Sequence, residues 1–139
     1  MTKRTLSLAA GTAMLVAFTT LSVTTSAAEM TCRVPFNFVA NGATLPAGNY
    51  YIASSGIAGA MTLRGLQKSA VVLTILADRR ESEIGRAKVV FLKTGDRYTL
   101  LEVWTPDGLA REVPGARKHV EERARAANAS VERIVVLAN

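Results

Sequence analysis

The stretch Ala87-Lys-Val-Val-Phe-Leu-Lys-Thr-Gly-Asp-Arg-Tyr-Thr-Leu-Leu-Glu-Val-Trp-Thr105 decides the fold. Two runs rich in β-branched and aromatic residues, 87–92 and 97–105, flank the turn-forming segment Lys93-Thr94-Gly95-Asp96. Glycine and aspartate suit the backbone conformations of tight turns, and the apolar runs on either side supply two strands that can pair. The stretch therefore predicts an antiparallel β-hairpin.

Short apolar runs broken by Gly, Asn, Asp and Pro continue upstream of this hairpin as far as Arg33. This spacing is typical of a meandering antiparallel β domain. Val34, Phe36 and Phe38 lie two apart, so we expect one face of a first strand to point into the core. The pair Asn41-Gly42 predicts the turn that ends this strand.

The middle of the chain predicts two more strands and a loop. Residues 61–64 are assigned to a short strand. Ser69-Ala-Val-Val-Leu-Thr-Ile-Leu76 is nearly all apolar, so it predicts a buried strand at the centre of the core. The charged segment 78–83 predicts a solvated loop.

The pattern changes near the C-terminus. Residues 116–127 are rich in Ala, Glu, Arg and Lys, which favour helix. The apolar stripe of this segment is only Val120, Ala124 and Ala127, so the helix should lie on the surface. Residues 131–137 then form a last strand that closes the sheet. The expected fold is all-β, a mainly antiparallel β-sandwich or barrel-like domain with one peripheral C-terminal helix followed by a last strand.

The first 28 residues have the three parts of a secretory signal peptide. Lys3 and Arg4 form a positive end, residues 6–23 are mostly apolar, and Ser26-Ala-Ala28 supplies small residues for cleavage. We therefore expect residues 29–139 to form a single β-rich domain that is secreted or periplasmic. No stable membrane anchor should remain after cleavage.

Charge and cysteine content narrow the possible partners. After residue 28 the chain keeps 15 of its 17 basic residues and all 11 acidic ones, a net charge of +4. This modest surplus of mixed charge does not indicate nucleic-acid binding. Cys32 is the only cysteine, so no disulfide can form within the chain. It either pairs with another chain or remains a half-buried free thiol near the first strand.

Three segments resemble a family of short exported bacterial proteins of uncharacterised function: Val34-Pro-Phe-Asn-Phe38, Leu45-Pro-Ala-Gly-Asn-Tyr50 and Gly95-Asp-Arg-Tyr-Thr-Leu-Leu-Glu-Val-Trp104. The resemblance spans nearly the whole chain after residue 28. It implies a signal peptide followed by a compact β domain, and it implies no activity, ligand or catalytic residue.

The sequence contains no complete set of catalytic or metal-binding residues. His119 is the only histidine and lies far in sequence from Cys32, so neither a nucleophile–histidine pair nor a common zinc site is expected, and no cofactor is indicated. Paired carboxylates are the remaining option for hydrolysis, and the candidate pairs are Glu81 with Glu83 and Glu102 with Asp107. The arginines beside Glu81 and Glu83 explain that pair as salt bridges on a loop.

The second strand of the hairpin carries the most specific binding hypothesis. Tyr98, Leu100, Glu102 and Trp104 lie two apart, which would place them on one face of the strand. An exposed aromatic row with a carboxylate is one way in which β domains bind sugars, so Tyr98, Glu102 and Trp104 are the candidate ligand-binding residues. The alternative is a central strand buried on both faces, with Glu102 paired to an arginine.

These observations predict an exported, non-catalytic binding or structural domain of the bacterial cell envelope or extracellular space. Its ligand is not specified, and an envelope polymer or protein is the expected kind of partner. Two alternatives remain open. One is a small secreted hydrolase that uses a carboxylate pair, and the other is a scaffold that self-associates through its edge strands.

Overall fold

The computed structural model describes residues 29–139, and the predicted signal peptide, residues 1–28, lies outside the described residues. The described chain is mostly β-structure with one α-helix and a short 3₁₀ turn. The elements are β1 (Met30–Val34), β2 (Phe38–Ala40), β3 (Ala43–Leu45), β4 (Gly48–Ser54), β5 (Ala60–Gly65), β6 (Ser69–Leu73), β7 (Ile75–Arg79), η1 (Glu81–Glu83), β8 (Lys88–Thr94), β9 (Arg97–Trp104), β10 (Leu109–Glu112), α1 (Ala116–Ala126) and β11 (Glu132–Leu137). The predicted fold class is confirmed.

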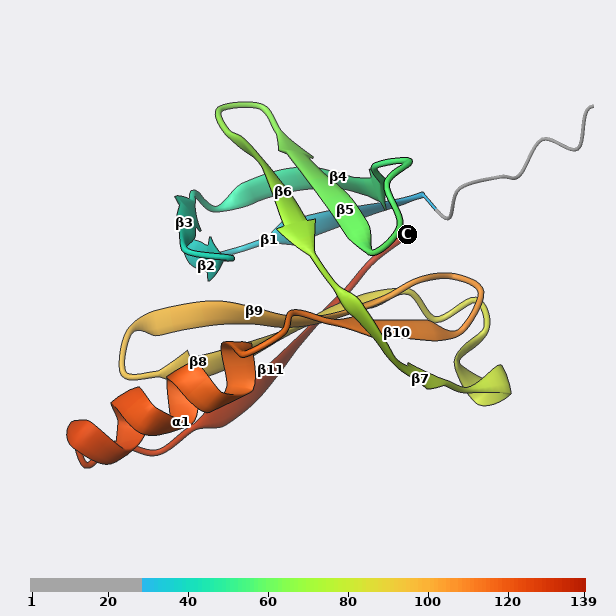
Figure 1. Cartoon of the computed structure of the whole chain (residues 1–139). Coiled ribbons are helices and arrows are strands. Elements are labelled where there is room, and N and C mark those ends of the chain that lie inside the picture. The colour runs from blue at the N-terminus through green and yellow to red at the C-terminus, as the bar shows by residue number, and fades with distance from the viewer. Residues whose placement is uncertain (1–28) are drawn as a thin grey trace, which may run out of the picture.

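The strands form two sheets, which appear as an upper and a lower layer in Figure 1. The four-stranded sheet has the order β1-β4-β5-β6. The larger sheet has the order β11-β8-β9-β10-β7, and the β2–β3 hairpin joins it through a short parallel pairing of β2 with β9. The helix α1 packs on the side of the larger sheet that faces away from the four-stranded sheet (Figure 1).

Two connections link the sheets at their edges. At one edge the chain runs from β6 into β7 through Thr74, so one continuous segment contributes to both sheets. At the other edge Cys32 of β1 bridges to Ala138, just after β11. Thr31 and Asn139 exchange two backbone hydrogen bonds there, with N···O distances of 2.8 and 2.9 Å. The arrangement is therefore a barrel-like sandwich.

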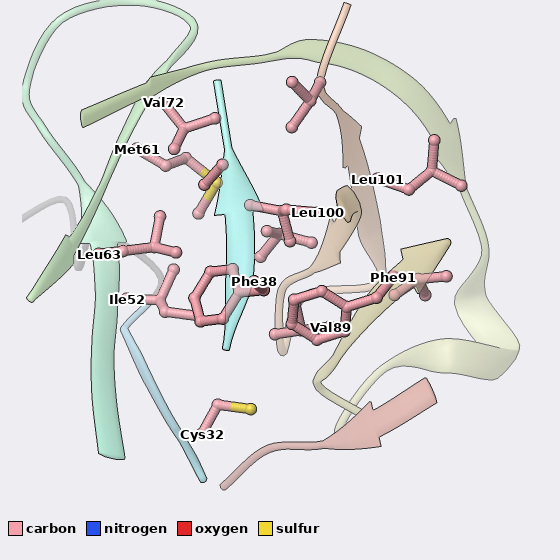
Figure 2. Close-up of a cluster of buried hydrophobic side chains, with 14 of the residues drawn as sticks. Cys32, Phe38, Ile52, Met61, Leu63, Val72, Val89, Phe91, Leu100 and Leu101 are labelled. Atoms are coloured by element: carbon pink, nitrogen blue, oxygen red, sulfur yellow. The ribbon is translucent and has the colours of Figure 1, made fainter. Parts of the chain in front are cut away.

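The hydrophobic core fills the space between the two sheets. Figure 2 shows Phe38, Phe91 and Leu100 from the larger sheet facing Ile52 and Leu63 from the smaller one. The rings of Phe38 and Phe91 meet edge to face, with centroids 5.2 Å apart. Each such side chain stabilises the fold by about 1.5–3 kcal/mol when it leaves water. This core, without a disulfide among the described residues, holds the sheets together.

The predicted first strand is in fact two strands that belong to different sheets. Val34 ends β1 opposite Gly48 in the smaller sheet, whereas Phe38 begins β2 opposite Leu45 in the larger sheet. Pro35 lies between them and has no N–H to continue a ladder. The single strand predicted from alternation was therefore wrong, although Asn41-Gly42 does form the following turn, with φ angles of 48° and 80°.

The segment Ser69–Leu76 is not the buried centre of the core. Only Val72 and Thr74 are buried in it. It forms edge strands of both sheets, so its outer side has no covering layer. Four large apolar side chains are consequently exposed; we call them the apolar stripe, and they are Val71 (56% exposed), Leu73 (59%), Ile75 (55%) and Leu76 (61%).

Other local predictions meet mixed outcomes. The hairpin of β8 and β9 is confirmed, with Gly95 in the left-handed region at φ 59°. The last strand is confirmed as β11, which pairs with β8. The charged segment 78–83 is only partly a loop, because β7 extends to Arg79 and η1 follows. β3 and β10 were not predicted.

The helix α1 lies at the periphery, as expected. It buries Ala116, Val120 and Ala124 against the larger sheet, whereas Ala127 is exposed beyond its end. Asn128 follows with a φ angle of 50°, a left-handed conformation that commonly ends helices. Within residues 29–139, no helix has the length and apolarity needed to cross a membrane.

Candidate binding sites

An extra residue in β9 changes which side chains share a face. On β8, Val90 pairs with Glu102, but the next residue, Phe91, pairs with Leu100. Leu101 is thus left without a partner on β8, which defines a β-bulge. A bulge inverts the in–out alternation of the residues beyond it. The predicted row of four side chains on one face is therefore divided between two faces.

Tyr98 lies on the inner part of this divided row. Its ring stacks on Phe36 with centroids 3.7 Å apart, and Phe36 meets Phe91 edge to face at 5.0 Å. Tyr98 is half-buried, and Lys93 Nζ lies 5.5 Å from its ring centroid. The side chain of Tyr98 therefore covers one end of the core.

Glu102 and Trp104 lie beyond the bulge on the outer part of the row and are also buried, at 8% and 4% exposure. Trp104 Nε1 donates a hydrogen bond to Glu102 Oε2 at 3.0 Å. The guanidinium of Arg133, on β11, donates to the same oxygen at 3.2 Å, and that of Arg117, on α1, lies 3.7 Å from Oε1. Glu102 is thus enclosed by a tryptophan and two arginines.

A second ion pair covers the other side of Trp104. Lys88 Nζ lies 4.9 Å from the centroid of the tryptophan ring and 2.9 Å from Glu83 Oε2. The hydrogen bond from Lys88 lowers the pKa of Glu83. Arginines were expected to pair with both Glu81 and Glu83, but Glu83 pairs with a lysine instead, and Glu81 has no ion pair within residues 29–139.

The burial of β9 argues against the predicted exposed aromatic row that would bind sugars. Every residue from Leu100 to Trp104 is buried, which matches the alternative of a central strand covered on both faces. Glu102 is paired to arginines, as that alternative also expected. Tyr98, Glu102 and Trp104 do not form one exposed aromatic row. The structure instead places them as packing groups at two different sites.

A groove that the sequence did not predict lies beside α1. It has a volume of about 470 Å³, within the range of roughly 300–1,000 Å³ that is usual for small-molecule sites. The β2–β3 turn, the start of β9 and the first two turns of α1 enclose it. We call it the α1 groove and define it by Val39, Thr99, Val113, Arg97, His119 and Arg123.

The charge in the α1 groove has one sign. Arg97 comes from β9, while His119 and Arg123 lie four residues apart and so share one face of α1. No aspartate or glutamate is among the residues that line the groove. Neither Arg97 nor Arg123 has an ion pair with any residue in 29–139.

The groove also has an apolar wall. Val39, Leu100, Val113 and Val120 contribute to it. Val39 reaches this position because β2 runs parallel to the start of β9, where it pairs with Thr99. No local sequence pattern predicts that β2 and β9, which lie far apart in the sequence, pair with each other. The spacing of His119 and Arg123 on the predicted helix was the one available signal.

Cys32 and the possible metal ligands offer no second site within the described chain. The thiol of Cys32 is 3% exposed, and burial raises its pKa to about 11. The thiol was predicted to be half-buried near the first strand; it lies within β1 and is buried. In residues 29–139 no three His, Cys, Asp or Glu side chains cluster as metal ligands would.

No family model, curated protein or solved structure matches this chain.

Proposed function

We propose that this chain is an exported, non-catalytic binding domain of the bacterial cell envelope or extracellular space, and that the α1 groove is its ligand site. The observation that carries the proposal is the groove itself, where an apolar wall and three basic side chains meet. Binding sites commonly combine a mostly apolar lining with a few polar groups that orient the ligand. The predicted site at Tyr98, Glu102 and Trp104 exposes less surface to a ligand, because Glu102 and Trp104 are buried.

The non-catalytic part of the proposal draws support from the candidate carboxylates. Glu83 is held by Lys88, and Glu102 is held by Arg117 and Arg133. A general acid needs a proton to give, and the hydrogen bond from Lys88 lowers the pKa of Glu83, which opposes that role. Hydrolysis of a glycan or ester substrate that Glu102→Gln or Glu81→Gln abolishes would overturn this part.

The groove can be tested by filling it. Val39→Trp places an indole at the groove, on a strand position that tolerates aromatic residues. Val135→Trp is the matched control, because Val135 is half exposed on β11 and does not line the groove. Ligand-observed NMR with a set of small anionic, neutral and cationic compounds should detect binding to the wild type and to Val135→Trp but not to Val39→Trp. The proposal fails if no compound shows this pattern while all three proteins are folded.

The apolar stripe favours a second candidate function, a scaffold that self-associates. It places Val71, Leu73, Ile75 and Leu76 at the edges of both sheets, and Ser69–Ala77 contains no charge or proline. Exposed edge strands usually carry charged residues or proline, which prevent pairing with another chain. The occupant in this proposal is a second copy of the chain. Sedimentation velocity that shows a monomer at all concentrations up to about 100 µM would exclude it, since such an association would then be weaker than about −5.5 kcal/mol.

A further inference from the structure

The α1 groove gathers basic side chains around a hollow that no carboxylate lines. Several basic side chains elsewhere have an acidic partner, as Lys88 has in Glu83 and Arg133 in Glu102. In the groove, Arg97 and Arg123 have no such partner within residues 29–139. Arginines gathered in a concave site without a carboxylate favour an anion, because they repel one another until a negative charge lies between them.

The backbone at the entrance of α1 adds to this preference. Gly115 caps the helix and has no side chain to accept hydrogen bonds from the first-turn N–H groups. No acidic residue lies in that first turn either. The N-terminal end of a helix favours negative charge, and Gly115 and Ala116 at this end line the groove together with His119 and Arg123. The groove thus offers an anion the arginine side chains and the positive end of the helix dipole.

The apolar wall favours a ligand that also has an apolar part. Val39 is half-buried at the groove, and Val113 and Val120, at 4% and 5% exposure, lie beneath it. A hydrocarbon chain or ring attached to the anion would cover them, and each buried methylene contributes favourably to binding. The volume of about 470 Å³ suits a compound of this kind.

We propose that the α1 groove binds a small amphiphilic organic acid, with its anionic group between Arg97 and Arg123 and its apolar body against Val39, Val113 and Val120. This inference rests on the proposed function of the groove as a ligand site. It adds the chemical class of the ligand. The acid is a free small molecule, and the alternative source of the same chemistry is an anionic lipid in a membrane.

The test is isothermal titration of the domain with octanoate, octanol and inorganic phosphate. Octanoate combines both features, whereas octanol has only the apolar chain and phosphate has only the charge. We expect octanoate to bind at least about tenfold more tightly than either, because octanol lacks the charge-assisted hydrogen bond and phosphate lacks the buried methylenes. Equal affinity for octanoate and octanol, or for octanoate and phosphate, would overturn the inference.

Paired arginine variants show which side chains act. Arg97→Gln/Arg123→Gln should weaken octanoate binding by about tenfold or more. Arg86→Gln/Arg125→Gln removes the same charge from positions outside the groove and should leave the affinity within about twofold, as expected for screened surface charges. Equal loss in the two double variants would mean that net charge alone attracts the acid, and would overturn the inference.

Two further arms distinguish the outcomes. We expect that vesicles of phosphatidylglycerol do not retain the domain. If the vesicles retain it through Arg97 and Arg123 and octanoate does not bind, the site binds a membrane headgroup and the free-acid proposal is overturned. If octanol binds as well as octanoate and Val39→Trp abolishes both, the groove is a ligand site and only the choice of an acid is wrong. If Val39→Trp changes no titration, the proposed function itself fails.

Discussion

Glu102→Ala should destabilise the domain more than any other loss of a single carboxylate, because this side chain is a buried acceptor. Trp104 Nε1 donates to it at 3.0 Å, and Trp104 is itself 4% exposed. Removing the carboxylate leaves the indole N–H without its partner and out of water. The arginines that share Glu102 can turn toward solvent, since their side chains are 47% and 49% exposed.

The expected cost follows from these contacts. A buried donor left without an acceptor costs about 1–3 kcal/mol. The two half-exposed arginine pairs add about 0–1 kcal/mol after solvent screening. The total is about 1–4 kcal/mol, which for a domain of this size lowers Tm by about 4–16 °C. Glu102→Gln keeps an acceptor for the indole and should cost no more than about half of this.

Urea denaturation followed by circular dichroism measures these free energies of unfolding. A double-mutant cycle with Trp104→Phe isolates the hydrogen bond, because phenylalanine keeps an aromatic ring and removes the donor. We expect a coupling energy of about 1–2 kcal/mol. If Glu102→Ala unfolds within about 0.5 kcal/mol of the wild type, Glu102 has no structural role and the reasoning is refuted.

Three further predictions concern a thiol, a turn and the apolar stripe. Burial raises the pKa of the Cys32 thiol to about 11, so this thiol should resist thiol reagents at pH 8 in the folded protein and react fully in denaturant; rapid labelling of the native protein would contradict this. Because the folded pKa exceeds the unfolded value of 9.0, the free energy of unfolding should fall as pH rises from about 9 to about 11. Gly108→Ala should cost about 1–3 kcal/mol more than Gly85→Ala in thermal unfolding. Both glycines have positive φ, but a Cβ at residue 108 would lie 2.5 Å from Arg80 O, whereas one at residue 85 meets nothing within 4 Å. Equal losses of stability would refute this steric argument. Leu73→Lys should leave the free energy of unfolding within about 0.5 kcal/mol of the wild-type value and weaken any self-association seen by sedimentation. Val72→Ala, at a buried position, should cost about 1–3 kcal/mol. A large loss of stability in Leu73→Lys would show that the apolar stripe is packed against other residues.

Predictions that depended on local sequence succeeded. The turn around Gly95 lies between two runs that pair with each other directly, so the hairpin needed no knowledge of the remaining chain. The helix was recognisable from composition, and its observed range of Ala116–Ala126 is one residue shorter than expected. In both cases the residues that specify the element are also the residues within it.

Predictions that depended on tertiary context failed. Apolar composition in Ser69–Leu76 indicated burial, but burial depends on what covers a strand, and no element covers the outer side of this edge. Alternation in β9 indicated one face for four side chains, but the alternation holds only while each residue has one partner. Leu101 has none on β8, and no local feature of the sequence marks it as the bulged residue.

The candidate site was hidden for a related reason. Arg97 and Arg123 are 26 positions apart in the sequence, and the wall at Val39 comes from yet another part of the chain. The packing of α1 on the larger sheet brings the two arginines to one groove, and the parallel pairing of β2 with β9 adds Val39. A sequence pattern can suggest that His119 and Arg123 share a helix face, but it does not place Arg97 in the same groove.

The two links between the sheets have a consequence for motion. Thr74 carries one strand directly from the smaller sheet to the larger, and Thr31 is hydrogen-bonded to Asn139 at the opposite edge. With both edges tied, neither sheet can slide or hinge away from the other without breaking main-chain hydrogen bonds. Slow exchange of core amides should therefore report one cooperative opening rather than two. A ligand that enters beside α1 meets a rigid floor, so the side chains at the rim, and not the strands, supply the adjustment on binding.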